Sequence, residues 1–173
     1  MTLELEIELR DVLESDLALI RDMRADTGLQ HCLLAHPQDR GPNDAEEWIA
    51  RRKREGKLWI IAHRGGSRGV GFIQLNRQHF LDRYAYFGIA MASQEKGKGY
   101  GFAAIRILFR TVDVELNLNK LLLEVRADNS AALSLYDRLG FRTAGLFEQH
   151  YFDGMQWHDV VAMERRLPAD HPS

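Results

Sequence analysis

The chain has 173 residues and a formal net charge of −2, with 45% hydrophobic and 28% charged residues. This composition is typical of a globular protein with a buried core, and it lacks the basic excess of a nucleic-acid-binding protein. Cys32 is the single cysteine, which excludes an intramolecular disulfide and a thiolate metal cluster. We expect one domain over residues 1–167, followed by a disordered tail over residues 168–173 (PADHPS).

The sequence has neither the pattern of a signal peptide nor that of a membrane-spanning segment. The N-terminal stretch MTLELEIELR alternates apolar and charged residues, unlike the continuous apolar core of a signal peptide. No apolar run approaches the length of a membrane span. We therefore expect a cytoplasmic protein that binds neither membranes nor nucleic acid.

The first elements are a strand and a helix. Residues 3–9 (LELEIEL) alternate with the period of a half-buried strand. Ser15 and Asp16 are candidate caps for a helix over residues 17–25. Residues 27–43 have no clear period and contain two prolines, so we expect a long loop with room for one helical turn.

The next predicted helix covers residues 45–55 and ends at Gly56. Asn43 or Asp44 can cap it. Its basic run, residues 51–54 (RRKR), could contact nucleic acid or a coenzyme phosphate. Neighbouring glutamates favour the other interpretation, a solvated helix face, because a specific basic patch needs more charge than this.

Strands dominate the middle of the chain. Residues 58–63 and 70–75 predict a hairpin, and residues 83–92 predict a third strand of the same sheet. A glycine-rich loop and a helix over residues 99–115 follow. Residues 120–127 (KLLLEVRA) are apolar enough on both faces to predict a central strand.

The last elements are a helix and a hairpin. Asn129 can start a helix, and Gly140 lies where a left-handed residue would end it. Two strands then flank Asp153-Gly154, a good hairpin turn: residues 141–151 and 157–166. The whole order predicts a mixed sheet with helices on its faces and one strand–helix–strand crossover. That crossover places the glycine loop at the end of a strand and the start of a helix.

The glycine loop reads QEKGKGYG over residues 94–101. A helix start exposes unpaired N–H groups and the positive end of the helix dipole, and glycines let an anion approach the main chain. Lys96 and Lys98 add positive charge. The spacing G-x-G-x-G, with Gly99 after Lys98, excludes both the P-loop and the dinucleotide fingerprint. From the loop alone, phosphate binding and a tight connection remain equal alternatives.

Longer stretches carry a family resemblance. IAMASQEKGKGYGFAAIRIL, LLLEVRADNSAALSLYDRLGF and YFDGMQWHDVVAM together resemble the GNAT superfamily of acetyl-CoA-dependent N-acetyltransferases. The loop from Lys96 to Gly101 matches the family form Arg/Gln-x-x-Gly-x-Gly/Ala, with Lys in place of Arg or Gln. The second motif runs from Asn129 through Tyr136 to Phe141 and is more specific. The resemblance is strong over residues 83–165 and, before that, rests on the order of elements.

The resemblance implies the GNAT fold, an α/β (α+β) architecture with a mixed, mostly antiparallel central sheet, helices on both faces and one βαβ crossover. It also implies acetyl-CoA as co-substrate, with the pantetheine arm lying along the strand before the loop and the pyrophosphate on the loop. The residues that it implies for coenzyme binding are Ile89, Met91, Lys96, Gly97, Lys98, Gly99, Tyr100, Gly101 and Asn129. Asn129 also fits a simple N-cap, and both roles can hold together.

The resemblance assigns Tyr136 as the general acid that protonates the leaving thiolate. A phenol with an unperturbed pKa of about 10 is protonated at neutral pH. The alternative is an ordinary amphipathic-helix residue. Glu124 is the candidate base, since some protein N-terminal acetyltransferases of the family have a glutamate in the same LEV context. Pairing of Glu124 with a nearby arginine is an equal alternative. Weaker candidates for the base are Glu148, His150 and Tyr86.

The implied activity is transfer of an acetyl group from acetyl-CoA to a primary amine by direct attack on the thioester. The acceptor could be a peptide N-terminus, an amino sugar, a polyamine or an antibiotic-like amine, and no sequence feature decides among them. The alternative is a catalytically silent acyl-CoA-binding sensor or interaction module of the same fold. The histidines show no metal-binding spacing, so we expect no metal. A homodimer is compatible with the sequence.

Overall fold

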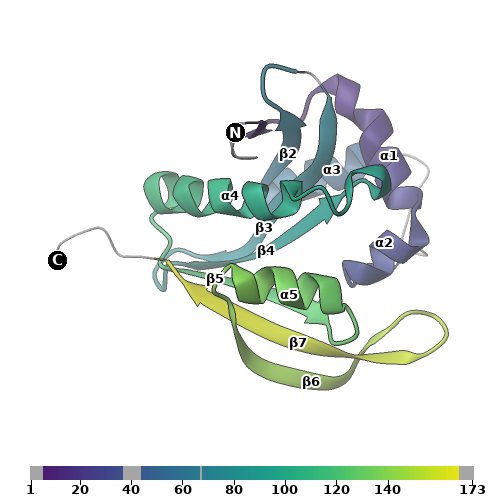
Figure 1. Ribbon diagram of the computed structural model, residues 1–173, viewed down its shortest axis with the longest axis vertical. Coiled ribbons are helices and arrows are strands. Elements are labelled where there is room, and N and C mark those ends of the chain that lie inside the picture. Colours follow the sequence, from purple (N-terminus) through teal and green to yellow (C-terminus); the bar gives the residue numbers. More distant parts are fainter. Residues whose placement is uncertain (1–5, 37–43, 67, 168–173) are drawn as a thin grey trace.

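The computed structural model describes residues 6–36, 44–66 and 68–167. Seven strands form one sheet with helices on both faces (Figure 1). The strand order is β1-β2-β3-β4-β5-β7-β6, and neighbours are antiparallel except β4 and β5, which are parallel. The predicted fold class is therefore confirmed, including the single βαβ crossover through β4, α4 and β5.

The bounds of the elements are as follows. The strands are β1 (Ile7–Arg10), β2 (Lys57–His63), β3 (Gly69–His79), β4 (Tyr84–Met91), β5 (Lys120–Arg126), β6 (Arg142–Phe152) and β7 (Trp157–Arg166). The helices are α1 (Leu17–Ala25), α2 (Thr27–Cys32), α3 (Asp44–Glu55), α4 (Tyr100–Leu116) and α5 (Ser130–Arg138), with single 3₁₀ turns at Glu14–Asp16 and Ser93–Glu95. No helix within the described ranges is long and apolar enough to cross a membrane.

The start of α1 differs from the prediction in its capping. Asp16 occupies the N-cap position, but its side chain makes no cap hydrogen bond. The carboxylate instead accepts hydrogen bonds from the Arg10 guanidinium at 2.7 and 3.0 Å and from the Leu13 N–H at 2.8 Å. These hydrogen bonds compensate the burial of the carboxylate, so Asp16 joins β1 to α1 rather than capping the helix.

The predicted loop over residues 27–43 contains a short helix, α2. Its N-cap is Asp26, whose carboxylate accepts a hydrogen bond from the Leu29 N–H at 2.9 Å. The next helix, α3, begins at Asp44, one residue earlier than predicted, and Asp44 is bound by the Arg24 guanidinium of α1. The proposed cap Asn43 lies outside the described residues, as does the predicted tail over 168–173.

The core has two parts, one on each face of the sheet. Alternate residues of β2 serve both: Leu58 and Ile60 pack with α1, α2 and α3, while Ile61 packs with α4. On the first face Trp48 of α3 contacts Phe72 edge to face, with ring centroids 4.9 Å apart. These two packed layers hold β2, β3 and β4 rigidly between helices, which fixes the strand next to the glycine loop.

β4 and β5 separate along their length. They pair at three positions, from Tyr84 with Lys120 to Tyr86 with Leu122. β3 stays paired with β4 as far as Met91. β5 turns instead toward β7, with which it pairs along its whole length. The sheet therefore opens into a V between the ends of β4 and β5, below the start of α4 (Figure 1).

The C-terminal hairpin forms as predicted around Asp153-Gly154. Gly154 has φ of 100°, which requires glycine, and the Asp153 carboxylate accepts hydrogen bonds from two N–H groups of the turn. β7 lies inside the sheet and β6 at its edge. Gly140, with φ of 80°, ends α5 in the left-handed conformation, as the sequence predicts.

Candidate active site

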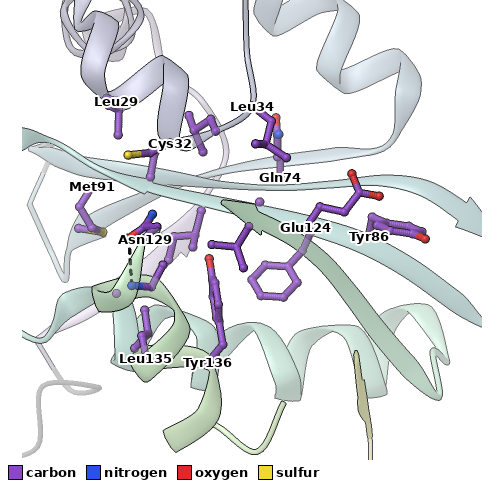
Figure 2. A pocket seen from close by; sticks show the side chains of 18 of the residues that line it. Leu29, Cys32, Leu34, Gln74, Tyr86, Met91, Glu124, Asn129, Leu135 and Tyr136 are labelled. Carbon is purple, nitrogen blue, oxygen red and sulfur yellow. Dashed lines mark hydrogen bonds between the residues drawn. The ribbon is translucent and has the colours of Figure 1, made fainter. Parts of the chain in front are cut away.

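A cleft of about 560 Å³ opens where β4 and β5 separate. Its walls come from β3, β4, β5, the start of α4, α5, α3 and the end of α2 (Figure 2). Tyr136 and Asn129 enter it from α5, and Glu124 enters from β5. The predicted candidates Tyr136, Glu124, Asn129, Ile89 and Met91 therefore line one cavity.

Beyond Tyr86, the backbone of β4 has no partner on its β5 side among the residues that the structure describes, and this edge faces the cleft. The Ala92 N–H donates to the Val70 carbonyl at 2.9 Å, so the even-numbered residues here direct their backbone groups toward β3. The alternate residues Ile89 and Met91 direct theirs the other way, into the gap that β5 has left. An extended ligand can pair with these groups as an added strand does.

The three glycines of the loop serve two different purposes. Gly97 and Gly99 have φ of 77° and 85°, a left-handed backbone in which a side chain is strained. Gly101 lies in the first turn of α4, and a side chain there would project between Met91, Ile89 and Leu135. Two glycines therefore shape the loop, and the third keeps the cleft open beside it.

The start of α4 has free N–H groups for an anion. Gly99 is the N-cap, and no side chain caps the helix. The first backbone bond runs from the Ala103 N–H to the Gly99 carbonyl, at 3.2 Å. The preceding N–H groups of a helix have no partner within it, and they point along the dipole toward the loop. The ring of Tyr100 packs against His63, and Tyr100 does not line the cleft.

A buried carboxylate that the sequence reasoning missed anchors the loop. Glu95 is 4% exposed and accepts hydrogen bonds from Lys98 at 2.8 Å and from Arg68 at 2.7 Å. The hydrogen bond from Lys98 holds the pKa of Glu95 below its usual value. Lys98 thus ties the loop to its base, while Lys96 is exposed at the rim of the cleft. The sequence contained one signal for this ion pair, the spacing of three residues between Glu95 and Lys98.

Tyr136 is buried to 8% exposure, and its ring lies against Phe87 and Phe141. Burial raises the pKa of its phenol to about 12. Its hydroxyl has no hydrogen-bond partner among the described residues and projects into the cleft (Figure 2). The group is therefore a protonated donor held in an apolar wall.

Asn129 is the N-cap of α5, because its side-chain oxygen accepts a hydrogen bond from the Ala132 N–H at 3.2 Å. The cap uses the oxygen, so the amide N–H₂ remains to donate into the cleft. Both roles considered for Asn129 are thus compatible with one geometry.

Glu124 lies beside an arginine. Arg77 of β3 donates to the Glu124 carboxylate at 3.2 Å and lies over the Tyr86 ring, 3.7 Å from its centroid. Arg77 reaches this position because β3 is irregular there, with φ of 47° at Arg77. All three residues line the cleft. The weaker candidates Glu148 and His150 are exposed on β6 and do not line it.

The basic run of α3 departs from the predicted solvated face at one position. Arg51, Lys53 and Arg54 are exposed, but Arg52 is half-buried and lines the cleft. No group of three or more His, Cys, Asp or Glu side chains in residues 6–36, 44–66 and 68–167 is arranged to hold a metal ion.

The sequence is similar to one protein-family model and to several named acetyltransferases. Residues 6–142 match the family model described as an acetyltransferase (GNAT) domain. The spermidine N(1)-acetyltransferase of Vibrio cholerae is 31% identical over 97 residues, which cover 54% of each chain. The [ribosomal protein bS18]-alanine N-acetyltransferase of Escherichia coli is 35% identical over 88 residues, 50% of this chain and 59% of that protein. The chain thus spans little more than half the length of the curated relatives it matches.

Solved structures agree over a longer stretch. Spermidine N-acetyltransferase from Vibrio cholerae, in complex with CoA and spermine, superposes with a TM-score of 0.85 at 22% identity, covering 94% of this chain and 96% of that one. A ribosomal L7/L12 alpha-N-protein acetyltransferase in complex with coenzyme A gives a TM-score of 0.83 at 20% identity, covering 95% and 96%. These likenesses establish the fold. Since the family model covers most of the sequence, the chain belongs to the GNAT acetyltransferase family.

Proposed function

We propose that the protein is an acetyl-CoA-dependent N-acetyltransferase, which moves the acetyl group to a primary amine by direct attack on the thioester. One observation carries the proposal. A single cleft is lined by the backbone of β4 beyond Tyr86, which has no partner on its β5 side among the described residues, by Lys96 and Gly101 of the glycine loop, and by Tyr136. These are the groups that an extended thioester with a pyrophosphate at one end requires.

The coenzyme would lie across the V of the sheet. Its pantetheine arm would pair with the backbone groups of Ile89 and Met91, replacing the strand partner that β5 does not supply. Its pyrophosphate would accept hydrogen bonds from N–H groups of residues 97–101 at the start of α4. The amide of Asn129 would donate to the arm from the opposite wall. Lys96 would add charge at the rim, while Lys98 would act through its bond to the loop.

The chemistry needs a proton removed from the amine. An alkyl ammonium with a pKa of about 10.4 is almost fully protonated at pH 7, and its nitrogen has no lone pair for attack. Glu124, directly or through water, would take this proton. The amine nitrogen then bonds to the thioester carbon, and the carbon–sulfur bond breaks to release the thiolate of coenzyme A.

Tyr136 would stabilise that thiolate. A phenol with a pKa of about 12 is a weaker acid than a thiol, whose pKa is about 8.5. Its hydroxyl therefore serves chiefly as a hydrogen-bond donor to the developing negative charge, in a wall where little water competes. The amine nitrogen loses its second proton as it becomes the amide nitrogen, and the thiolate takes up this proton to leave as the free thiol of coenzyme A.

Family membership supports the proposal, and the relatives show the range of acceptors. Their names include spermidine and ribosomal proteins, a polyamine and peptide N-termini. Both kinds of acceptor are amines, so we propose an amine acceptor for this protein as well. The relatives do not identify which amine it is.

The test measures binding and turnover separately. We expect acetyl-CoA, and neither ATP nor NADH, to raise the melting temperature, because a ligand at 100 times its Kd adds about 2.7 kcal/mol to stability. Release of the free CoA thiol with a panel of amines measures turnover. Stabilisation without turnover, together with no effect of Tyr136→Phe, would favour the silent acyl-CoA-binding module. No stabilisation at millimolar acetyl-CoA would remove the coenzyme assignment.

A further inference from the structure

A side chamber of about 190 Å³ adjoins the cleft. The two cavities share Leu33, Arg52 and Gln74 in their walls, so the chamber opens beside the cleft at these residues. The chamber lies between α1, the end of α2, α3 and β3. It lies outside the motifs of the family resemblance, but two residues of the basic run on α3, Arg51 and Arg52, line it.

The chamber is lined by arginines. Arg24, Arg51, Arg52 and His36 contribute to its wall, and no described residue that lines it carries a carboxylate. Arg24 is bound by Asp44, so its charge is compensated outside the chamber. Arg51 and Arg52 also bring positive charge to the chamber, and Arg52 is paired with Glu55, which does not line the chamber.

Arg52 is the best placed of these groups. Its Nη1 donates to Glu55 at 3.0 Å, but its Nε is buried and has no hydrogen-bond partner in the part of the chain that the structure describes. Burial lowers the pKa of Arg52, and the charges of Arg51 and Arg24 lower it further, against the opposing effect of Glu55. A buried guanidinium N–H that faces like charges is stabilised by an anion.

The cleft beside the chamber contains two amide side chains whose oxygens can accept hydrogen bonds. The side-chain oxygens of Gln74 and Asn76 are buried and without a donor among the described residues. Gln74 lines the cleft (Figure 2). Asn76 lines it too, and Gln74 also borders the chamber. Amide oxygens accept hydrogen bonds from an ammonium group, and guanidinium groups bind carboxylate or phosphate. A substrate with both charges fits this arrangement.

We propose that the acceptor is an amine that carries an anionic group, a carboxylate or a phosphate, and that this group binds in the side chamber against Arg52. The amine then lies in the cleft near Gln74 and Asn76, facing the thioester. The inference rests on the proposed acetyltransferase function and narrows its substrate class. It disfavours polyamines, because a second ammonium group beside Arg51 and Arg52 would be repelled and would leave the chamber's donors unpaired.

The first experiment compares matched acceptors with the wild-type protein and acetyl-CoA. One pair is 4-aminobutyrate and butylamine, which tests a carboxylate. Another is O-phosphoethanolamine and ethanolamine, which tests a phosphate. Spermidine is the polycation. We expect kcat/KM to be at least about tenfold higher for the anionic member of one pair than for its neutral partner, and higher than for spermidine. The pair with the larger ratio identifies the anionic group.

The second experiment changes the chamber. Arg52→Gln should reduce the preference for the anionic acceptor toward equality while leaving the KM for acetyl-CoA unchanged. Arg54→Gln, an exposed position on the same helix, is the matched control and should change neither value. Arg51→Gln should reduce the preference less than Arg52→Gln, and it provides a second variant if Arg52→Gln does not fold.

The outcomes distinguish a failure of the anionic-acceptor inference from a failure of the proposed acetyltransferase function. Turnover of spermidine or neutral amines without any preference for anionic acceptors would overturn the inference and leave the acetyltransferase function standing. A preference that Arg52→Gln and Arg51→Gln both leave intact would overturn the role of the chamber. No turnover with any acceptor, in a protein that acetyl-CoA does not stabilise, would overturn the proposed function and this inference with it.

Discussion

The two ends of the cleft differ in the groups that they present to a ligand: mainly backbone at one end and mainly side chains at the other. The end near α4 offers backbone groups of β4, Gly101 in the first turn of the helix and one neutral phenol. The other end offers charged and amide side chains, among them Arg52, Arg77, Glu124 and Gln74. Backbone groups bind one constant ligand in many sequences, because they do not depend on side-chain identity. Side chains can change with the acceptor. We therefore propose that the end near α4 binds the coenzyme and that the other end binds the acceptor; they are called the coenzyme end and the acceptor end below.

Tyr136→Phe tests the coenzyme end most severely. We expect kcat to fall about 100-fold or more, because the leaving thiolate loses its donor, while the KM for acetyl-CoA changes little. The ring contacts with Phe87 and Phe141 remain available in the variant. Steady-state kinetics measure both values. Tyr84→Phe, a tyrosine outside the cleft lining, is the control. Equal losses in the two variants would contradict the role given to Tyr136.

The same residue predicts a pH dependence of stability. The pKa of Tyr136 is raised to about 12 from 10, so the folded state retains the proton at pH values where the unfolded chain has lost it. The free energy of unfolding of the wild type should therefore fall between pH 10 and pH 12 by more than that of Tyr136→Phe. Urea unfolding at several pH values in this window measures the difference, and parallel curves would contradict the burial of the phenol.

Gly99→Ala tests whether the loop geometry matters to the coenzyme. The left-handed φ of 85° costs an alanine about 1–2 kcal/mol, so the loop will shift and the KM for acetyl-CoA should rise about tenfold. Gly65→Ala is the control, since Gly65 has φ of 69° in the turn after β2, with open space around it. It should lose similar stability without a change in KM. A similar rise in KM in both variants would show a general effect of strain.

Glu124→Gln tests the acceptor end. If Glu124 removes the ammonium proton, kcat/KM at pH 7 should fall about tenfold or more, and the deficit should shrink as the pH approaches the pKa of the acceptor amine. Glu164→Gln on β7 is the control, because Glu164 likewise pairs with cations, Lys120 and Arg142. A deficit that stays constant with pH would assign Glu124 to pairing with Arg77 instead of catalysis.

Glu95→Gln should have the smallest effect, on stability. Loss of the charge that binds Lys98 and Arg68 should cost about 1–2 kcal/mol at pH 7. The pKa of Glu95 is lowered in the folded state, so this contribution is present above pH 4.5 and is lost as the pH falls further. Urea unfolding of both proteins at pH 7 and pH 4 checks the sign. Glu46→Gln, which breaks an exposed pair with Arg21, should cost close to nothing.

The same contrast explains what the sequence could predict. Gly97, Gly99 and Asn129 could be found because a left-handed turn and a helix cap demand particular residue types at fixed spacing. The hairpin around Gly154 was predictable for the same reason. The strands and helices followed from their periods, and α2 was underestimated because six residues are too few to establish a helical period.

The acceptor end could not be predicted, because its residues meet through tertiary packing. Arg77 reaches Glu124 by an irregularity in β3, and the two are separated by 47 positions in the chain. Arg52 is half-buried while its basic neighbours are exposed, because α3 packs on the sheet through the face that carries Arg52. Glu95 becomes buried because Arg68 and Lys98 enclose it from two different loops. Apart from the spacing of three residues between Glu95 and Lys98, none of these contacts has a local signature.

The three paired positions between β4 and β5 have a mechanical consequence. They are the sheet's own connection between its two parts, and beyond Tyr86 the strand β4 has a free edge. We expect the amide hydrogens of Ile89 and Met91 to exchange rapidly with solvent deuterium in the free protein. A coenzyme arm seated along this edge would slow that exchange and join both parts into one cooperative unit. The thioester would then be a structural member of the sheet for as long as it remains bound.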